Sequence, residues 1–226
     1  MSLFSPHVRQ GALTALPLVI PAIPFALVFG IVVESSGIAA WVGWSSSPII
    51  FGGAAQITLI TLLGEGASIA AAVTAALIVG ARHLLYSVTM APHFKDQPLW
   101  FRWLGPYVLI DQVFALMSLE HHDDPDVFRQ RFLAIGFTFW AFWVVATAIG
   151  IVIGPLVPGN WNIAFAAPVL FMGLLATGAN DWRKVLVAIV AGVMTALLAD
   201  MPNKGGLLVG ALVGIALGAA MERLQR

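Results

Sequence analysis

Residues 67–90 read ASIAAAVTAALIVGARHLLYSVTM, an apolar run with an arginine and a histidine well inside it. An apolar run of this length is typical of a transmembrane helix. A charge at membrane depth costs at least ~2.5–3.5 kcal/mol on insertion scales, so an ionisable residue there indicates a substrate or ion pathway. The alternative is that Arg82 extends its charge to one membrane interface and has no such role. We favour the pathway.

The whole chain has the composition of a polytopic membrane protein. Hydrophobic residues make up 60% of its 226 residues, charged residues 10%, and the mean hydropathy is +0.93, whereas soluble domains carry about 25% charged residues. The formal net charge is zero, so we expect no nucleic-acid partner. Cysteine is absent, which excludes disulfides and thiolate metal sites. Residues 1–7 lack the basic region and cleavage site of a secretion signal, so we expect the first apolar segment to be retained.

Apolar runs of suitable length predict about eight transmembrane helices, arranged as a single all-α transporter domain over residues 1–226. Residues 38–44 are also apolar and could form a separate half-helix, which would change the count. The predicted spans are Gly11–Val33, Trp44–Leu63, Ala67–Met90, Trp103–Leu119, Arg131–Gly154, Trp161–Gly178, Val185–Ala199 and Gly205–Met221.

The positions of the basic residues predict which side of the membrane holds the termini. With eight spans, one side would carry Arg9, Arg129, Arg131, Arg183, Lys184, Arg223 and Arg226, and the other Lys95, Arg102 and Lys204. Cytoplasmic loops are enriched in Lys and Arg. We therefore expect a multi-pass protein of the cytoplasmic membrane with both termini in the cytoplasm.

Two proline-led segments suggest an inverted repeat. Residues 24–30 read PFALVFG, and residues 168–173 read PVLFMG. If these segments correspond, the repeats cover 11–91 and 161–221, and an odd number of spans between them gives the two units opposite orientations. Inverted repeats with interrupted helices are typical of secondary transporters, which bind their substrate near the midplane.

The last predicted span carries glycines at every fourth position. They are Gly206, Gly210, Gly214 and Gly218, and they leave a smooth stripe along one helix face. Such a stripe allows the backbone of another helix to approach closely. Two interpretations stay open: packing within this chain, and a face for a partner or for a moving helix.

A second intramembrane polar group follows a weakened helix. Residues 47–58 read SPIIFGGAAQIT, so a proline and paired glycines come just before Gln56. Backbone groups freed at membrane depth must line a cavity or be buried in protein. The Gln56 amide both donates and accepts hydrogen bonds, which suits a zwitterion. The alternative is a contact between helices, worth about 0.6 kcal/mol on average.

Asp111 is the carboxylate that lies clearly inside a predicted span, and we expect it to pair with Arg82, because leaving both charges unpaired would be costly. Tyr86 lies four residues after Arg82 on one helix face, and His83 lies close to that face. Arg82 could hold a carboxylate with two hydrogen bonds. Histidine is the residue type that can change its charge near neutral pH, so His83 is the candidate for proton coupling. A purely structural polar network is the alternative.

Taken together, these segments resemble the AzlC-type branched-chain amino acid exporters. The resemblance is carried by residues 24–30, by FGGAAQ at 51–56, by ARHLLY at 81–86 and by Asp111, and it covers nearly the whole chain. It implies a secondary exporter of hydrophobic amino acids that acts with a small AzlD-type membrane subunit. The family usually has Asp-Glu in the fourth span, whereas Gln112 follows Asp111 here. This departure puts a two-acid proton relay in doubt.

We therefore predict alternating access for an amino-acid substrate, with no cofactor and no metal. The expected substrate-binding residues are Pro24, Phe25, Phe29, Gly52, Gly53, Gln56, Arg82 and Tyr86, and the expected proton-coupling residues are His83 and Asp111. The sequence lacks the phosphate-binding loop of nucleotide-driven pumps, so the energy would come from an ion gradient or a partner.

Other readings of the sequence are weaker. Residues 120–126 have metal-ligand residue types, but without helical histidine spacing we expect a solvated loop. An intramembrane enzyme would need a nucleophile with a base, or a metal cluster, inside the spans. A channel would need a selectivity filter or a charged ring. A membrane subunit that does not itself transport would fit the glycine stripe alone.

Overall fold

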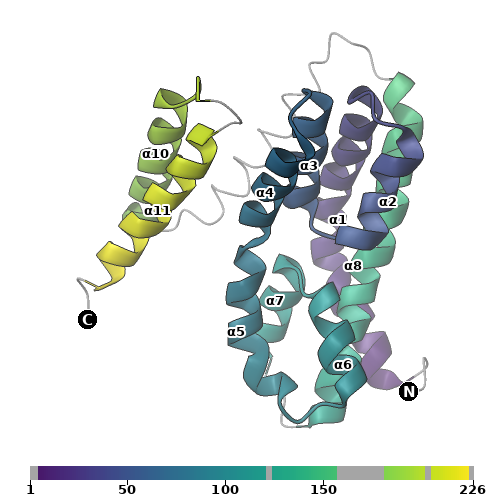
Figure 1. Ribbon diagram of the computed structural model, residues 1–226. Coiled ribbons are helices and arrows are strands. Elements are labelled where there is room, and N and C mark those ends of the chain that lie inside the picture. Colours follow the sequence, from purple (N-terminus) through teal and green to yellow (C-terminus); the bar gives the residue numbers. More distant parts are fainter. Residues whose placement is uncertain (1–4, 121–123, 157–180, 202–204, 224–226) are drawn as a thin grey trace.

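The computed structural model describes residues 5–120, 124–156, 181–201 and 205–223. Within these ranges every regular element is helical, so the predicted all-α class is confirmed (Figure 1). Three of the described helical segments are long and apolar enough to cross a membrane: Pro6–Ser35, Ile69–Phe94 and Pro125–Leu156. The predicted sixth span lies outside the described residues.

Two long helices form the central pair of the fold, α1 (Pro6–Ser35) and α8 (Pro125–Ile153) (Figure 1). They have 30 and 29 residues, which at ~1.5 Å per residue gives a length of about 45 Å, enough to cross a bilayer. Small residues let their backbones approach closely. A Cβ atom added to Gly30 would lie 2.7 Å from the Cα atom of Gly150.

The helix α1 is continuous through its prolines. Pro17, Pro21 and Pro24 all lie on its exposed face. A proline within a helix has no N–H to donate to the carbonyl four residues earlier. The carbonyls of Leu13, Pro17 and Ile20 therefore lack their usual helical donors, and the interruptions expected of this fold occur in later segments.

The second predicted span is two half-helices, α2 (Ala40–Ile50) and α3 (Gly53–Gly64). They are separated at Phe51, which has a left-handed backbone with φ of 44°. With 11 and 12 residues, each is too short to cross a bilayer, which takes about 20 residues. The prediction of one continuous helix over 44–63 is therefore wrong. The alternative of a separate half-helix over 38–44 is met only in part, because the observed half-helix begins at Ala40 and continues to Ile50.

The two half-helices fold back on each other. The Gln56 Nε2 atom donates to the Ser46 hydroxyl at 2.8 Å, whereas ten residues of continuous helix would hold them ~15 Å apart. A Cβ atom added to Gly64, at the end of α3, would lie 3.0 Å from the Ser36 carbonyl oxygen, next to the end of α1. The segment is a re-entrant hairpin that starts and finishes at the same end of the fold. We call it the first hairpin.

The third predicted span is confirmed as a helical crossing with an interruption. It consists of α4 (Ile69–Gly80) and α5 (Arg82–Phe94), which meet at Ala81. In Figure 1, α4 lies beside the first hairpin and α5 continues below it, so the chain returns to the end where α1 begins. The helix changes direction next to the Arg-His pair.

The fourth predicted span is also not one helix. Residues 99–118 form α6 (Leu99–Leu104), the 3₁₀ turn η1 (Gly105–Val108) and α7 (Asp111–Ser118). Leu109 and Ile110, which are not helical, separate η1 from α7. The segment enters and leaves at the same end, as the next contacts establish, and we call it the second hairpin.

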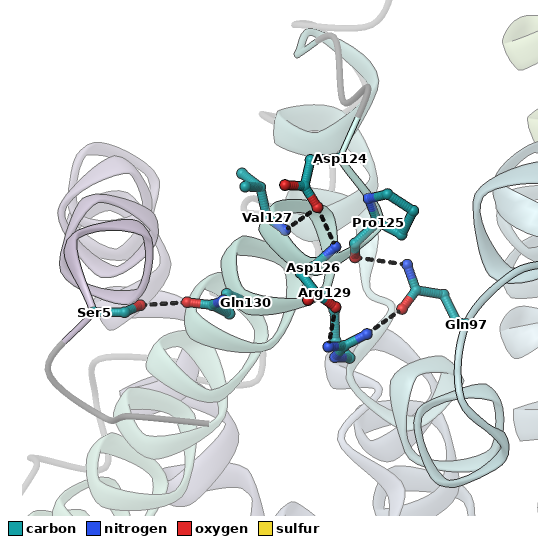
Figure 2. Close-up of polar contacts among 8 residues, drawn as sticks. All are labelled: Ser5, Gln97, Asp124, Pro125, Asp126, Val127, Arg129 and Gln130. Atoms are coloured by element: carbon teal, nitrogen blue, oxygen red, sulfur yellow. Dashed lines mark hydrogen bonds and ion pairs between the residues drawn. The ribbon is translucent and has the colours of Figure 1, made fainter.

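Both ends of the second hairpin are attached to the start of α8. Before the hairpin, Gln97 Nε2 donates to the Pro125 carbonyl at 2.8 Å and Gln97 Oε1 accepts from Arg129 at 2.9 Å (Figure 2). After the hairpin, Glu120 accepts from Arg131 Nε at 2.6 Å. The hairpin therefore rises from the end of the fold where α1 and α8 begin.

The tips of the two hairpins meet halfway along α8. The Tyr107 hydroxyl, at the tip of the second hairpin, donates to the Pro48 carbonyl of the first. It also accepts from Trp140 Nε1 at 2.6 Å. The Tyr107 ring lies 6.3 Å from the Phe51 ring, centroid to centroid. The two hairpins enter from opposite ends and are joined through one phenol.

The described residues thus contain an inverted arrangement that differs from the predicted repeat. Residues 6–64 and residues 69–118 each form a long helical crossing followed by a re-entrant hairpin, and the two units run in opposite directions. The predicted correspondence of 11–91 with 161–221 depends on residues 161–178, which lie outside the described residues. It stays a prediction.

The structure corrects the predicted distribution of basic residues. Lys95 and Arg102 were expected opposite Arg129 and Arg131, but the re-entrant courses of residues 40–64 and 99–118 together put all four at the end where α1 begins. The Arg129 guanidinium lies 5.9 Å over the Trp100 ring, which confirms the proximity. The other end carries Glu34 and Glu65, with no Lys or Arg between residues 34 and 68. This asymmetry strengthens the prediction of a cytoplasmic N-terminus.

The predicted seventh and eighth spans correspond to α10 (Trp182–Leu197) and α11 (Gly205–Arg223), which pack against each other. The glycine stripe of α11 faces α10. A Cβ atom added to Gly210 would overlap the Thr195 hydroxyl and lie 2.7 Å from the Ala191 carbonyl oxygen. Of the two interpretations of the stripe, packing within this chain is the one found.

Cysteine accessibility tests the re-entrant course, since the chain has no cysteine of its own. We expect the cysteines of Asp96→Cys and Arg9→Cys to be labelled from the same side of the membrane, and that of Ala39→Cys from the opposite side. With the basic end in the cytoplasm, a membrane-impermeant maleimide added to intact cells should label Ala39→Cys alone. Labelling of Asp96→Cys together with Ala39→Cys would instead support a complete crossing over residues 44–63.

A glycine pair tests the packing of α10 on α11. Gly210→Ala should lower the melting temperature of the detergent-solubilised protein by several degrees, because overpacking costs about 1–3 kcal/mol. Gly192→Ala is the matched control, since a Cβ atom there meets nothing within 4 Å. An added methyl at this helical position should be neutral or stabilising. Equal melting temperatures for the two variants would contradict the packing.

Candidate functional site

Three interruptions of the helices meet near the middle of the fold (Figure 1). They lie at residues 51–52, at Ala81 and at residues 105–110. Tyr107 connects the first to the third, and an ion pair connects the second to the third. Backbone groups freed at membrane depth must be satisfied inside protein or at a water-filled cavity. This region is therefore the candidate site.

The predicted ion pair between Arg82 and Asp111 is present. Arg82 Nη1 lies 2.9 Å from Asp111 Oδ2, and the side chains are 37% and 39% exposed. Asp111 is the first residue of α7, where the helix dipole favours a carboxylate. The pair joins the long crossing α4–α5 to the second hairpin, and its partial exposure leaves it accessible to a solute.

Arg82 keeps hydrogen-bonding capacity beyond this pair. Its Nε atom is buried and has no hydrogen-bond partner among the described residues. A guanidinium has five N–H donors in a fork that matches a carboxylate. An unpaired buried donor is costly, and a carboxylate placed beside Arg82 would satisfy it.

Aromatic rings form one wall beside the ion pair. The Tyr86 ring stacks on the Phe114 ring, with centroids 4.6 Å apart. The His83 ring meets Tyr86 edge-on at 5.7 Å. His83 Nδ1 lies 2.8 Å from the Gly80 carbonyl oxygen. Because a carbonyl only accepts, Nδ1 carries a hydrogen, and His83 bonds the carbonyl just before the interruption at Ala81.

Gln56 belongs to a separate, fully buried network. Its Oε1 atom accepts from the Gly52 N–H and from Trp143 Nε1, both at 3.1 Å. Its Nε2 atom donates to Ser46 at 2.8 Å and to Ser47 at 3.4 Å. Two bonds accepted and two donated use the capacity of the amide. In this conformation Gln56 connects helices and has nothing left for a substrate.

Three further predicted substrate-binding residues pack against Trp143 of α8. The Phe25 and Phe29 rings lie 5.5 and 5.8 Å from its indole ring, and Phe29 is fully buried. A Cβ atom added to Gly53 would lie 2.7 Å from Phe25 and 3.1 Å from Trp143. These residues hold the first hairpin against α1 and α8. Pro24 lies on the exposed face of α1 instead.

The predicted single site is therefore two clusters. We call the first the charged cluster; it consists of Arg82, His83, Tyr86, Asp111 and Phe114. We call the second the hairpin anchor; it consists of Phe25, Phe29, Gly52, Gly53, Gln56 and Trp143. The hydrogen bonds, the ion pair and the ring contacts given above for the described residues each lie within one cluster or the other. The prediction of one substrate site that includes residues of both clusters stays a prediction.

Sequence reasoning missed the residues that join the hairpins, Tyr107 and Trp140. The signal available was the Gly105-Pro106-Tyr107 turn inside an apolar run, which marks an interruption as Ser47-Pro48 does. It also placed Glu120 in a solvated loop, whereas Glu120 forms an ion pair with Arg131, whose side chain is buried. Arg131 also lies 3.4 Å from the Thr14 hydroxyl. Among the described residues no group of three metal-ligating side chains occurs.

Comparisons with known proteins place these features in a family. The model of the AzlC protein family matches residues 17–157, which include both hairpins and the charged cluster. An uncharacterized membrane protein of Archaeoglobus fulgidus is 29% identical over 91% of each chain. The inner membrane protein YgaZ of Escherichia coli is 27% identical over 96% of this chain and 89% of its own. No solved structure matches the chain.

A double-mutant cycle tests the Arg82–Asp111 pair. Arg82→Gln and Asp111→Asn each leave one charge without its partner at membrane depth, so each should lower the yield of folded protein more than the double variant does. The yield can be measured by fluorescence-detected size exclusion of a tagged protein. Losses that simply add in the double variant would mean that the two charges are independent.

Proposed function

We propose, given that the chain belongs to the AzlC family of membrane proteins, that it is a secondary transporter exporting branched-chain or other hydrophobic amino acids across the cytoplasmic membrane. The observation that carries this proposal is the half-exposed Arg82–Asp111 pair at the meeting point of interrupted helices. Intramembrane charges next to interrupted helices are the usual binding sites of secondary transporters.

The charged cluster matches the two ends of a zwitterion. The Arg82 guanidinium, whose side chain is partly exposed, can bind the carboxylate of an amino acid. The Asp111 carboxylate can bind the ammonium group. An amino acid would therefore enter between the two charges and replace one ion pair with two. The Tyr86 and Phe114 rings next to the pair offer apolar surface for the side chain.

The same arrangement offers a way to couple substrate transport to proton movement. Protonated Asp111 cannot hold an ammonium group by charge, so a proton and an amino acid exclude each other at this carboxylate. Mutual exclusion at one group is what exchange of a proton for a substrate requires. Asp111 is therefore the first candidate for coupling, and His83, whose ring contacts Tyr86, is the second.

The two hairpins provide the means for alternating access. They approach the candidate site from opposite ends of the fold, and their tips share the bond from Tyr107 to Pro48. The second hairpin also carries Asp111. Separation of Asp111 from Arg82 by a substrate would free this hairpin from α5, which offers a physical link between binding and movement.

A small AzlD-type subunit remains part of the proposal. The glycine stripe of α11 is covered by α10, so it is not the surface that we assign to such a partner. A subunit without transport activity is the alternative function, and an intramembrane enzyme is a further one. Transport by the chain, with and without the small subunit, separates these functions.

Purified protein in liposomes tests the mechanism. With an acidic lumen, proton exchange should drive accumulation of radiolabelled leucine, valine or methionine. Asp111→Asn should abolish this accumulation, because it removes both the ammonium partner and the titrating group. His83→Gln keeps a hydrogen-bonding side chain and should accumulate substrate if Asp111 alone couples. Asp96→Asn, outside the charged cluster, is the matched control.

Each outcome assigns the coupling. Accumulation by Asp111→Asn but not by His83→Gln would move the coupling to His83. Accumulation by both variants at the level of the parent would remove proton coupling from the charged cluster. If the parent moves none of these amino acids, with or without the small subunit, the proposed substrate class is wrong.

A further inference from the structure

The second hairpin and α5 enclose a groove that does not contain the charged cluster. Its volume is about 570 Å³, and it lies between α5 and the segment formed by α6 and η1. Most of its lining is apolar, including Val88, Ala91, Pro106 and Leu109, and Arg82, Tyr86 and Asp111 do not line it. The groove is therefore distinct from the proposed substrate site.

Two basic side chains line the same end of this groove. Lys95 follows the end of α5, and Arg102 lies on α6, so both are at the end of the fold where α1 begins. Within the described residues neither side chain forms an ion pair, not even with the neighbouring Asp96. The groove thus combines an apolar floor with two free positive charges at one end.

The surroundings of the groove place it at the boundary between hydrocarbon and headgroups. Val88 is 74% exposed, as suits a side chain that faces lipid. Trp100 and Trp103 on α6 are exposed at the level of the basic residues, and tryptophan is enriched at membrane interfaces. An open apolar groove that ends in unpaired cations at this level is complementary to an anionic lipid.

We propose that this groove binds an anionic phospholipid from the leaflet on the N-terminal side. The phosphate would lie between Lys95 and Arg102, and one acyl chain would run along Val88, Ala91 and Leu109 toward the middle of the membrane. A phospholipid is favoured over a passing solute because the lining is apolar along its length and has its charges at the headgroup level. The lipid would join α5 to the second hairpin from outside.

Native mass spectrometry of the purified protein tests this site. The parent should retain phosphatidylglycerol in preference to phosphatidylcholine with the same acyl chains. Each basic residue near an anionic surface raises the affinity roughly fivefold. In the combined Lys95→Gln and Arg102→Gln variant, the preference for phosphatidylglycerol over phosphatidylcholine should therefore fall roughly 30-fold. Arg9→Gln is the control, since Arg9 is an exposed basic residue on the same side but outside the groove.

A second variant addresses the apolar part of the groove without altering charge. Ala91→Phe should fill the groove and reduce lipid retention, whereas Leu84→Phe, on the exposed part of α5 outside the groove, should not. Unchanged retention in both groove variants would overturn the proposal. The proposal would also be overturned if the groove variants retained phosphatidylglycerol normally but transported amino acids more slowly, both in phosphatidylglycerol liposomes and in phosphatidylcholine liposomes. The groove would then be a path for the solute.

Discussion

The bond from the Tyr107 hydroxyl to the Pro48 carbonyl holds the fold together at its centre. Carbonyls in the last turn of a helix have no partner within that helix, and at membrane depth there is no water to replace it. A half-helix that ends in the membrane is possible only where another part of the chain supplies the donor. Tyr107 does so from the opposite hairpin, and Trp140 donates to its oxygen. Each hairpin tip is therefore stabilised by the other.

The sequence predicted the long crossings and the ion pair, because both follow from the cost of placing polar groups in hydrocarbon. It did not predict the hairpins. Apolar composition is the same whether residues 44–63 cross the membrane or turn back halfway. The bond from Gln56 to Ser46, which joins the two half-helices, forms only in the folded chain. The error over residues 44–63 had a second consequence, since it moved Lys95 and Arg102 to the wrong side.

The division into a charged cluster and a hairpin anchor could not be read from residue types. A glutamine with free donors and acceptors suits a substrate as well as it suits two serines and a tryptophan, and only the observed bonds distinguish the two uses. Arg82 differs from Gln56 in this respect. Its pair with Asp111 is half-exposed and its Nε atom is unpaired, so its capacity is only partly used within the chain.

The arrangement of these two clusters suggests which hairpin moves. The first hairpin is fixed to α1 and α8 by the buried bonds of Gln56 and by the rings around Trp143, whose disruption would leave several polar groups unpaired at once. The second hairpin is attached to α5 through the half-exposed Arg82–Asp111 pair, which a zwitterion can replace charge for charge, and through the stacked rings of Tyr86 and Phe114 and of Phe94 and Phe101. A substrate can therefore replace the ion pair at the second hairpin at a small cost in free energy. The bond between Tyr107 and Pro48 would transmit this change to the first hairpin, which enters from the opposite side of the membrane.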